Sequence, residues 1–266
     1  MAIIEIDSLE RPELKVFTSL TDTRLRSSEL SDDGIFIAES PKVIMTAIDC
    51  GYRPLSLLCE KKHITGDAAC IIDRFKDLDV FTGSREILTG LTGYTLTRGV
   101  LCAMKRKRSA EAEKLLAGCQ TVAMLHQVCD ATNIGAIFRS AAALGIDAVL
   151  LTPGTCDPLN RRSIRVSMGA VFRMKWAFLD NPLKQLKRQG FKTIALALTE
   201  TALPLDSTIL KEIPKKALIL GTEGDGLDKK TIEKSDFTAK IPMYNSVDSL
   251  NVGVAAAIAF WEFRRL

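Results

Sequence analysis

The sequence lacks any long apolar segment. No uninterrupted apolar run in its 266 residues approaches the roughly 18 to 20 that a membrane-spanning helix requires. The first residues, MAIIEIDSLERPELK, also lack the basic, apolar and small-residue regions of a secretory signal. Hydrophobic residues nevertheless make up 47% of the chain and charged residues 26%, which is enough to bury a core. We therefore expect a globular, cytoplasmic protein without a membrane partner, and the length suggests two domains.

Cysteine and histidine are too few and too scattered to predict a metal site. The 7 cysteines are odd in number and run from Cys50 to Cys156 without a CxxC pair, which argues against a zinc site or a disulfide framework. We expect them to be reduced and mostly buried. Of the 2 histidines, His126 falls within an apolar strand-like run and is interpreted as a satisfied core residue. No metal cofactor is expected.

The charge balance is only mildly basic. A net charge of +4 does not by itself identify a nucleic-acid-binding protein. Two local clusters are more informative, namely the run Lys105–Arg108 and the group formed by Arg161, Arg162 and Arg165. Clusters of this kind are often solvated faces or linkers, so each alone is as consistent with that role as with phosphate binding.

Hydrophobic periodicity divides the chain into two α/β parts. Between Ile35 and about Met104, short β-rich runs (IFIAE, PLSLLC, VLCAM) alternate with helical stretches such as PKVIMTAIDCG and SREILTGLTG. From Thr121 onward, the runs TVAMLHQV, AVLLT, KTIALAL, KALILG and FTAKI are far enough apart for crossover helices, which predicts a parallel sheet covered by helices. We predict a small α/β domain over 1–107, a linker or linking helix over 108–118, and a second α/β domain over 119–266.

Three segments of the second half stand out by their composition. They are Asn133–Gly145 (NIGAIFRSAAALG), Leu220–Leu227 (LGTEGDGL) and Ile241–Ala255 (IPMYNSVDSLNVGVA). Each taken alone has an ordinary structural explanation as well as a functional one.

In the first segment, Asn133 stands where the N-cap of an amphipathic helix is expected. Arg139 shares a helix face with Gly135 and Ala142, which is an unusual setting for a surface arginine. Because a guanidinium donates several hydrogen bonds at once, an arginine among small residues suits a phosphate contact at close approach.

The second segment predicts a sharp turn at the end of a strand. GTEGDG does not fit the dinucleotide-binding pattern GxGxxG, so a nucleotide-dependent oxidoreductase is disfavoured. Gly221, Gly224 and Gly226 would instead let the backbone approach a flat ligand and present N–H and C=O groups to an adenine edge. A plain strand-to-helix turn is the alternative.

In the third segment, Pro242 ends a strand and a polar loop leads into the last helix. Ser249 or Asn251 can cap that helix. The run NVGVAAAIAFWEF is apolar on nearly every side, so it must be buried under the sheet or against another subunit.

Together, in this order and at this spacing, the three segments resemble the signature motifs of the SpoU (TrmH-like) RNA ribose 2′-O-methyltransferases of the SPOUT superfamily. The resemblance extends through RVSMGAVFR (Arg165–Arg173) and covers almost all of the second domain. It implies a parallel-sheet α/β domain with a deep trefoil knot, a rare exception to the rule that chains do not knot. It also implies S-adenosylmethionine as the cofactor, bent within the knot, and RNA as the substrate.

The resemblance further implies the site residues. The candidate catalytic residues are Asn133, Arg139, Glu223, Ser249 and Asn251, and the candidate cofactor-binding residues are Leu198, Thr199, Gly221, Gly226, Ile241, Met243 and Leu250. Because a guanidinium is effectively never deprotonated, we expect Arg139 to hold an RNA phosphate and to stabilise alkoxide charge. Glu223 would accept the proton or hold Asn133 and the loop backbone, while Ser249 and Asn251 would orient Arg139 and the cofactor.

The sequence departs from the family pattern at Ala131, Asn245 and Gly253, where the family often has Pro, Gly and Ser. These departures spare the candidate catalytic set. In the first half, FIAESPKVIMTAIDCGYRPLSLLC followed by LTRGVLCAM resembles the L30e-like substrate-binding domain of this branch, with Ser40 in place of a usual Gly. That resemblance implies RNA recognition by shape and phosphate contact.

Several alternatives remain open from the sequence. Ribosomal RNA is the expected substrate because of the added first domain; transfer RNA and a noncatalytic RNA-binding or ribosome-assembly role on the same fold are the alternatives. The NxGxxxR pattern favours ribose over base methylation. The sequence does not name the RNA, the nucleotide or the terminal proton acceptor, nor does it separate housekeeping modification from antibiotic resistance. The apolar final helix and the small residues of 133–145 predict a homodimer through the second domain, which the resemblance also implies.

Overall fold

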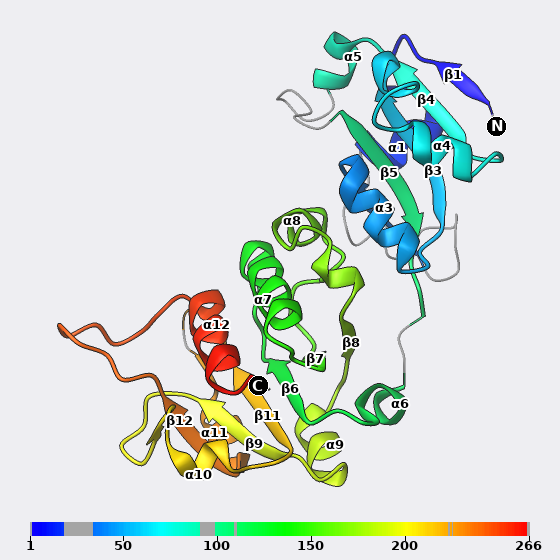
Figure 1. The fold of residues 1–266 in the computed structure, drawn as a ribbon. Helices are drawn as coiled ribbons and strands as arrows, with labels where there is room; N and C mark the ends of the chain where they lie inside the picture. The colour runs from blue at the N-terminus through cyan, green and yellow to red at the C-terminus, as the bar shows by residue number, and fades with distance from the viewer. Residues whose placement is uncertain are drawn as a thin grey trace. The chain divides into compact units, whose positions relative to one another are not determined.

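The computed structural model describes residues 2–18, 34–90, 99–108, 111–222, 224 and 226–264, which form two compact units (Figure 1). Unit 1 contains the described residues up to Arg108 together with Leu159–Phe172. Unit 2 contains the described residues between 111 and 158 and from Arg173 onward. Within these described ranges, no helix is long and apolar enough to cross a membrane.

A mixed five-stranded sheet is the frame of unit 1. Its strand order is β1 (Ile3–Glu5), β4 (Asp79–Gly83), β3 (Pro54–Glu60), β5 (Val100–Lys105) and β2 (Ile35–Glu39). The first three strands are parallel, and β5 runs antiparallel to both β3 and β2. The helices of this unit are α1 (Lys15–Thr18), α3 (Pro41–Asp49), α4 (Ala69–Arg74) and α5 (Arg85–Thr89), with 3-10 turns η1 (Pro12–Leu14) and η2 (Lys61–His63).

A segment from the second half of the chain packs into unit 1. It contains α8 (Arg161–Val166) and the 3-10 turn η3 (Ala170–Phe172). The Arg161 guanidinium lies 3.1 Å from the buried carboxylate of Glu39, at the end of β2. The ring of Phe172 packs against Phe36 and Tyr52, with centroids 5.5 and 5.1 Å away. An ion pair and an aromatic cluster therefore anchor this segment to the first sheet.

Unit 2 is built on a sheet of parallel strands. The strand order is β10 (Leu203–Pro204), β12 (Phe237–Lys240), β9 (Lys192–Leu196), β11 (Lys216–Leu220), β6 (Thr121–Leu125), β7 (Ala148–Leu151) and β8 (Lys175–Phe178). Every residue of β6, β7 and β11 is buried. Apolar runs of this kind are typical of parallel strands whose two faces are both covered.

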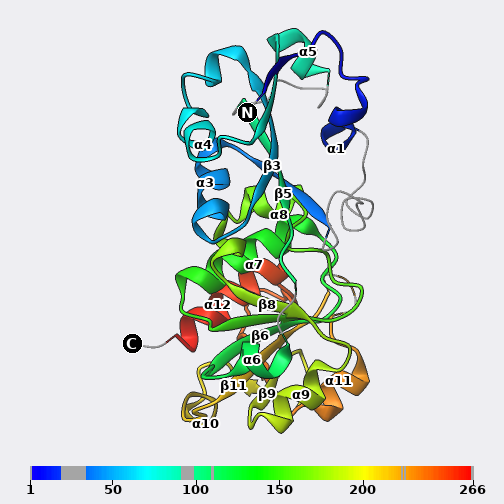
Figure 2. The same cartoon turned by 90° about the vertical axis from the view of Figure 1, so that its right-hand side faces the viewer.

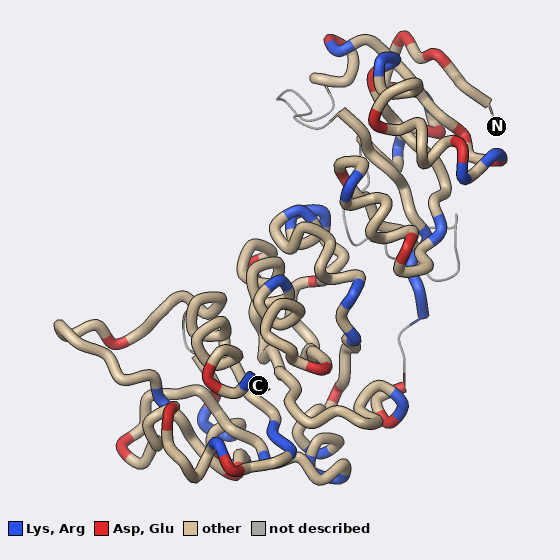
Figure 3. Tube along the Cα trace, viewed as in Figure 1, with Lys and Arg blue, Asp and Glu red and all other residues tan. Residues whose placement is uncertain are grey.

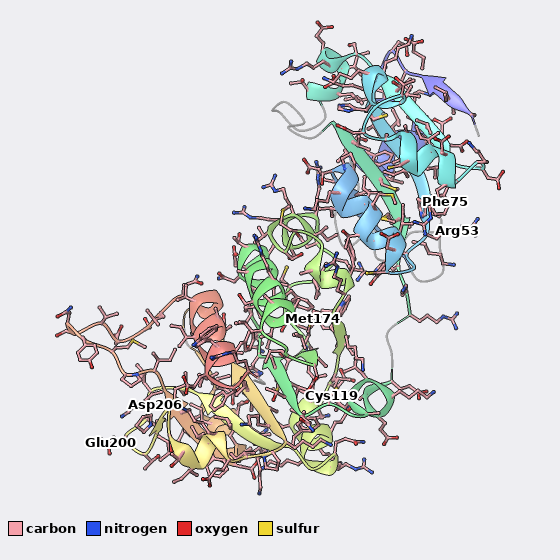
Figure 4. The ribbon with its side chains drawn as sticks, in the orientation of Figure 1. Arg53, Phe75, Cys119, Met174, Glu200 and Asp206 are labelled. Carbon is pink, nitrogen blue, oxygen red and sulfur yellow. The ribbon has the colours of Figure 1, made fainter. Side chains whose placement is uncertain are left out.

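Helices cover both faces of this sheet (Figure 2). The helices α7 (Ala131–Ala143) and α12 (Val252–Glu262) pack against each other on one face, and α6 (Ala112–Leu116), α9 (Pro182–Arg188) and α11 (Lys229–Lys234) lie on the other. A short helix, α10 (Thr208–Lys211), follows β10. Leu115 and Leu116 of α6 share one hydrophobic core with Leu186 of α9 and with Cys119, which Figure 4 labels between α6 and β6. By these contacts α6 belongs to unit 2.

The α/β class and the parallel sheet of the second half are confirmed. Four strands were not predicted from the sequence, namely β8 and β10 of unit 2 and β1 and β4 of unit 1. β10 is a two-residue edge strand, and β8 (KWAF) begins and ends with partly exposed residues, so neither has the buried apolar run that marked the other strands.

Fewer cysteines are buried than the sequence predicted. Cys59, Cys102 and Cys119 are buried, but Cys70 and Cys129 are exposed. Burial raises the pKa of the Cys59 thiol to about 11, and it raises the pKa of Cys102 further. Position in the fold decides burial for such a small side chain, and spacing along the sequence does not reveal it.

Candidate functional site

A pocket of about 610 Å³ opens at the carboxyl ends of three adjacent strands of unit 2, β12, β9 and β11. The loops that follow parallel strands converge at this edge, which is where open α/β sheets bind their ligands. Three stretches of chain build most of the wall: the end of β9 with the residues after it, the end of β11 with the glycine-rich loop after it, and the chain from the end of β12 into α12. Ile232 of α11 completes it. The lining residues are Leu196, Ala197, Leu198, Leu220, Gly221, Thr222, Gly224, Gly226, Leu227, Ile232, Ala239, Lys240, Ile241, Met243, Asp248, Ser249, Leu250, Asn251, Val252 and Ala255.

The glycine-rich loop is a tight turn. Thr222 and Gly226 form an isolated antiparallel bridge, and Gly226 has a φ of 68°. A Cβ atom at Gly221 would collide with the carbonyl group of Gly226, so only glycine fits at that position. The turn thereby places backbone polar groups against the pocket. Glu223, one of the predicted catalytic residues, lies outside the described residues.

The predicted cofactor-binding residues converge on this pocket with one exception. Six of them line it: Leu198, Gly221, Gly226, Ile241, Met243 and Leu250. Thr199 does not line it, although its hydroxyl is buried and has no hydrogen-bond partner among the described residues. This hydroxyl lies shortly after the end of β9, and it can still form a hydrogen bond.

Asn251 caps the last helix and connects it to the first motif. Its Oδ1 accepts hydrogen bonds from the N–H groups of Gly253 and Val254, at 2.9 and 3.4 Å. Its Nδ2 donates to Oδ1 of Asn133 on α7, at 3.0 Å. Of the two predicted caps, Asn251 is therefore the cap, whereas the Ser249 hydroxyl donates to Asp248 at 3.3 Å.

Asn133 is not the N-cap of its helix, which corrects the sequence analysis. That role belongs to Asp130, whose Oδ1 accepts hydrogen bonds from the N–H groups of Thr132 and Asn133, at 2.7 and 3.0 Å. Asp130 stands immediately before α7, so the helix begins earlier than expected. Because Asp130 satisfies the first turn, the Asn133 side chain is available to Asn251.

The predicted catalytic residues fall into two groups by position. Ser249 and Asn251 line the pocket, and Asn133 is tied to Asn251. Arg139 is exposed on α7 and does not line the pocket. The structure thus assembles the ends of α7 and α12 at the pocket and leaves the Arg139 guanidinium accessible to another molecule.

Residues 120–261, more than half of the chain, match the model of the SpoU rRNA Methylase family. The chain belongs to this family.

Individual SpoU relatives cover between 79% and 98% of the chain. It is 34% identical over 261 residues to an uncharacterized tRNA/rRNA methyltransferase of Mycobacterium bovis, spanning 96% of this chain and 89% of the relative. It is 31% identical over 225 residues to the 23S rRNA (guanosine(2553)-2′-O)-methyltransferase RlmP of Bacillus subtilis, covering 79% of this chain and 88% of RlmP. The AdoMet-bound rRNA methyltransferase of Sinorhizobium meliloti superposes with a TM-score of 0.84 at 25% identity, covering 98% and 97% of the two chains.

The pocket of this SpoU protein has the size and chemistry that S-adenosylmethionine requires. Its volume lies within the range of about 300 to 1,000 Å³ typical of small-molecule sites. Leu198, Ile241 and Leu250 supply apolar walls for a flat base, and the Gly221 turn supplies backbone groups. The carboxylate of Asp248 also lines the pocket and suits a cationic ligand. Among the described residues, no group of three or more His, Cys, Asp or Glu side chains could hold a metal ion.

Sequence reasoning missed one acidic residue that lines the pocket of this SpoU protein and another that follows the glycine-rich loop. Asp248 lies in the polar loop that was quoted, but nothing in its spacing marks it as a pocket residue. Asp228 caps α11, directly after the glycine-rich loop, and its carboxylate lies 2.8 Å from Nε2 of His126. The Thr231 hydroxyl, and more weakly His126, hold the pKa of Asp228 below its usual value.

His126 is therefore not the satisfied core residue that was expected. It is half-buried one position beyond β6, where its N–H bonds the Leu220 carbonyl, and its buried Nδ1 has no partner among the described residues. The side chain ties the end of β6 to the far end of the glycine-rich loop. No local sequence pattern indicates this contact, because His126 and Asp228 are 102 positions apart.

Proposed function

We propose that this SpoU protein transfers a methyl group from S-adenosylmethionine to a ribose 2′-hydroxyl of ribosomal RNA. One observation carries the proposal: the Asn133–Asn251 hydrogen bond joins the helix that bears Arg139 to the loop that lines the pocket. The 2′-O specificity and the ribosomal substrate are those named for the Bacillus subtilis relative. Transfer RNA is the second candidate, because the mycobacterial relative is named for both RNAs.

For this reaction the protein must position the two reactants and stabilise the charge that develops on the 2′-oxygen. Bound S-adenosylmethionine supplies an electrophilic methyl group on a cationic sulfur. Arg139 would hold an RNA phosphate and stabilise negative charge on the attacking 2′-oxygen, since a guanidinium does not act as a base. Asn133 and Asn251 would fix α7 against the pocket, Ser249 would orient Arg139 and the cofactor, and Glu223 would hold the loop backbone or accept the proton. Holding the reactants in line supplies a large share of such a rate.

The pocket wall is consistent with the trefoil knot that the SpoU resemblance implies. In the strand order, β9 lies between β12 and β11, so the loops after all three meet at one edge. We infer that the chain from Ile241 to Asn251 threads through the preceding loops. The cofactor would then lie bent between the Gly221 turn and Leu250.

We assign RNA binding to residues 1–107, which resemble the L30e-like domain, and methyl transfer to residues 119–266, with residues 108–118 as the connection. Arg162 and Arg165 of α8 are exposed, and the α8 segment belongs to unit 1. Figure 3 shows α8 largely in the blue of Lys and Arg. Exposed arginines suit phosphate contact. A ribosomal RNA substrate would place the protein in the cytoplasm.

A homodimer through unit 2 completes the proposal. A groove of about 550 Å³ runs between α7 and α12, and its members include Val254, Ile258 and Trp261, exposed by 50%, 37% and 56%. Apolar side chains on one helix face at this exposure suit burial against a second copy. Asn251 lines both this groove and the cofactor pocket, so a second copy there would lie next to the reacting groups.

Cofactor binding separates the enzyme from a noncatalytic RNA-binding protein on the same fold. At a concentration about 100 times its Kd, S-adenosylmethionine should raise the free energy of unfolding by about 2.7 kcal/mol. S-adenosylhomocysteine serves as the second ligand and methylthioadenosine as the truncated control. A thermal midpoint that responds to none of them would support the noncatalytic alternative.

A further inference from the structure

The loop between β12 and α12 carries an aromatic residue that the cofactor pocket does not use. Figure 1 shows this loop projecting from the sheet of unit 2 before the chain returns to α12. Tyr244, on that loop, is 82% exposed, and Val247 is 53% exposed. Exposed aromatic rings of this kind mark interaction sites.

The tip of the loop has a defined conformation. Asn245 and Ser246 both have left-handed backbone, with φ of 55° and 57°, and the Val247 N–H donates to the Tyr244 carbonyl at 3.2 Å. Two consecutive positive-φ residues closed by this hydrogen bond form a type I′ turn. Tyr244 is therefore held at the first position of a tight turn.

The same loop forms one wall of the cofactor pocket. Met243 precedes Tyr244 and lines the pocket, and Asp248, Ser249 and Leu250 line it on the return path. Tyr244 itself is not among the lining residues, nor is it among those of the α7–α12 groove. Its ring thus stands beside the pocket, directed neither into it nor into the groove assigned to a second copy.

The composition of the loop indicates what the ring contacts. From Pro242 to Leu250 the loop contains no Lys or Arg, so it offers no cation to a phosphate. An RNA substrate brought to this edge exposes bases, and splayed-out bases stack on aromatic side chains. Of the other exposed aromatic residues, Trp261 lies in the α7–α12 groove, with the Arg264 guanidinium 3.5 Å from its ring centroid.

We propose that Tyr244 is a stacking platform for a base of the RNA substrate, at or next to the nucleotide that is methylated. The proposal rests on the proposed function, because it requires RNA at this pocket. Stacking tolerates every base, so Tyr244 supplies affinity and placement but little base selectivity. The side chain acts on the substrate and not on the cofactor.

Three variants of the full chain test this role, each assayed for methyl transfer to an unmodified 23S rRNA transcript at saturating S-adenosylmethionine. Tyr244→Leu should raise KM for RNA by roughly 5- to 100-fold, which is the cost of losing one stacked base. Tyr244→Phe keeps the ring and should stay within about two-fold of wild type, as should the matched control Val247→Ala at the same tip. The Kd for S-adenosylmethionine, from calorimetry, should not change.

Binding of a fluorescein-labelled oligoadenylate, measured by anisotropy, gives the same comparison without catalysis. Tyr244→Leu should weaken binding, and an abasic version of the oligonucleotide should lose the difference between the variants. Equal RNA affinity and KM for wild type and Tyr244→Leu would overturn the proposal. A parallel loss of cofactor affinity, or a shift in sedimentation, would also overturn it by assigning the ring to the cofactor or to a second copy. Wild-type protein that binds oligoadenylate through Tyr244 but methylates no RNA would sink the proposed function alone.

Discussion

Arg139 is the residue on which the proposed chemistry depends most. It is exposed on α7 and outside the cofactor pocket, so its removal should leave the cofactor site intact. We expect Arg139→Ala to reduce methyl transfer by about 100-fold or more, the loss typical of removing one donor that stabilises developing negative charge. The Kd for S-adenosylmethionine should remain within about three-fold. Kinetics and calorimetry on the same preparation check both expectations.

A matched substitution on the same helix controls for this experiment. Ala142 is exposed on α7 and has no assigned role, so Ala142→Ser should leave both quantities unchanged. If Arg139→Ala weakens cofactor binding as much as it slows transfer, the assignment of Arg139 to RNA is wrong.

Ser40 has a strained backbone conformation, and it stands where the family usually has Gly. It precedes α3 with a φ of 79° and a ψ of 140°, and its buried Oγ has no partner among the described residues. That backbone region strongly favours glycine, and a non-glycine residue there costs on the order of 1 to 3 kcal/mol. Glycine loses about 0.5 to 1 kcal/mol more chain entropy on folding, so Ser40→Gly should raise the free energy of unfolding of unit 1 by about 1 kcal/mol.

The same substitution at another helix start is the control for Ser40. Ser84 precedes α5 with a φ of −67°, and its Oγ accepts a hydrogen bond from the Ile87 N–H. Ser84→Gly should therefore lower stability, by a few tenths of a kcal/mol. Urea denaturation of both variants measures the difference, and equal losses at the two sites would refute the strain at Ser40.

Single residues of the site could be predicted where local geometry decides their role. Asn251 was among the two expected caps because a polar side chain before an apolar helix satisfies free N–H groups. The cap of α7 was placed at Asn133 instead of Asp130, because ATNIG does not show where the helix begins. The bond between Asn133 and Asn251 joins residues 118 positions apart, and no local pattern contains it.

At the scale of elements, the four basic residues of the run Lys105–Arg108 do not all have the same role. Lys107 donates to the Cys50 carbonyl at the end of α3 and lies 4.6 Å from the Tyr52 ring centroid. Lys107 is therefore a structural residue, and Arg108 beside it is exposed. Neutralising the whole run Lys105–Arg108 should weaken RNA binding and reduce its salt dependence.

The salt slope separates these contributions. Lys107→Gln should lower the stability of unit 1 and leave the slope of log K against log salt nearly unchanged, whereas neutralising all four residues should reduce the slope. Filter binding at several salt concentrations gives the slope, and denaturation gives the stability. If the slope stays constant when all four residues are neutralised, the run does not contact RNA phosphates and is only a solvated linker.

A strand of either sheet could be predicted from the sequence only where it coincides with an apolar run. The strands β2, β3 and β5 of unit 1 and β6, β7, β9, β11 and β12 of unit 2 meet that condition. The attachment of 159–172 to unit 1 does not follow from any run, because the Glu39–Arg161 ion pair spans 122 positions. Long-range pairing of this kind depends on tertiary packing, which periodicity does not encode.

At the scale of the whole molecule, the groove between α7 and α12 predicts a second copy. Ala257 lines that groove and is half-buried, so Ala257→Glu would place a charge on the proposed contact surface. We expect this variant to sediment as a monomer at low micromolar concentration and to lose methyl transfer, because an unpaired charge in an apolar interface is strongly unfavourable. Ala117→Glu, at an exposed position of unit 2 outside the groove, is the control. A monomeric Ala257→Glu protein with full activity would show that one copy suffices.

The central claim is methyl transfer to a ribose 2′-oxygen of ribosomal RNA, and one measurement tests it most directly. Unmodified 23S rRNA and unmodified transfer RNA are incubated separately with the wild-type protein and S-adenosylmethionine carrying a tritiated methyl group. The label is then located by nuclease digestion and mass spectrometry of the nucleosides. We predict label on 23S rRNA, on the ribose of a single nucleotide, and a rate of labelling lower by about 100-fold or more with Arg139→Ala. Label on a base, label on transfer RNA alone, or no label on either RNA would contradict the account.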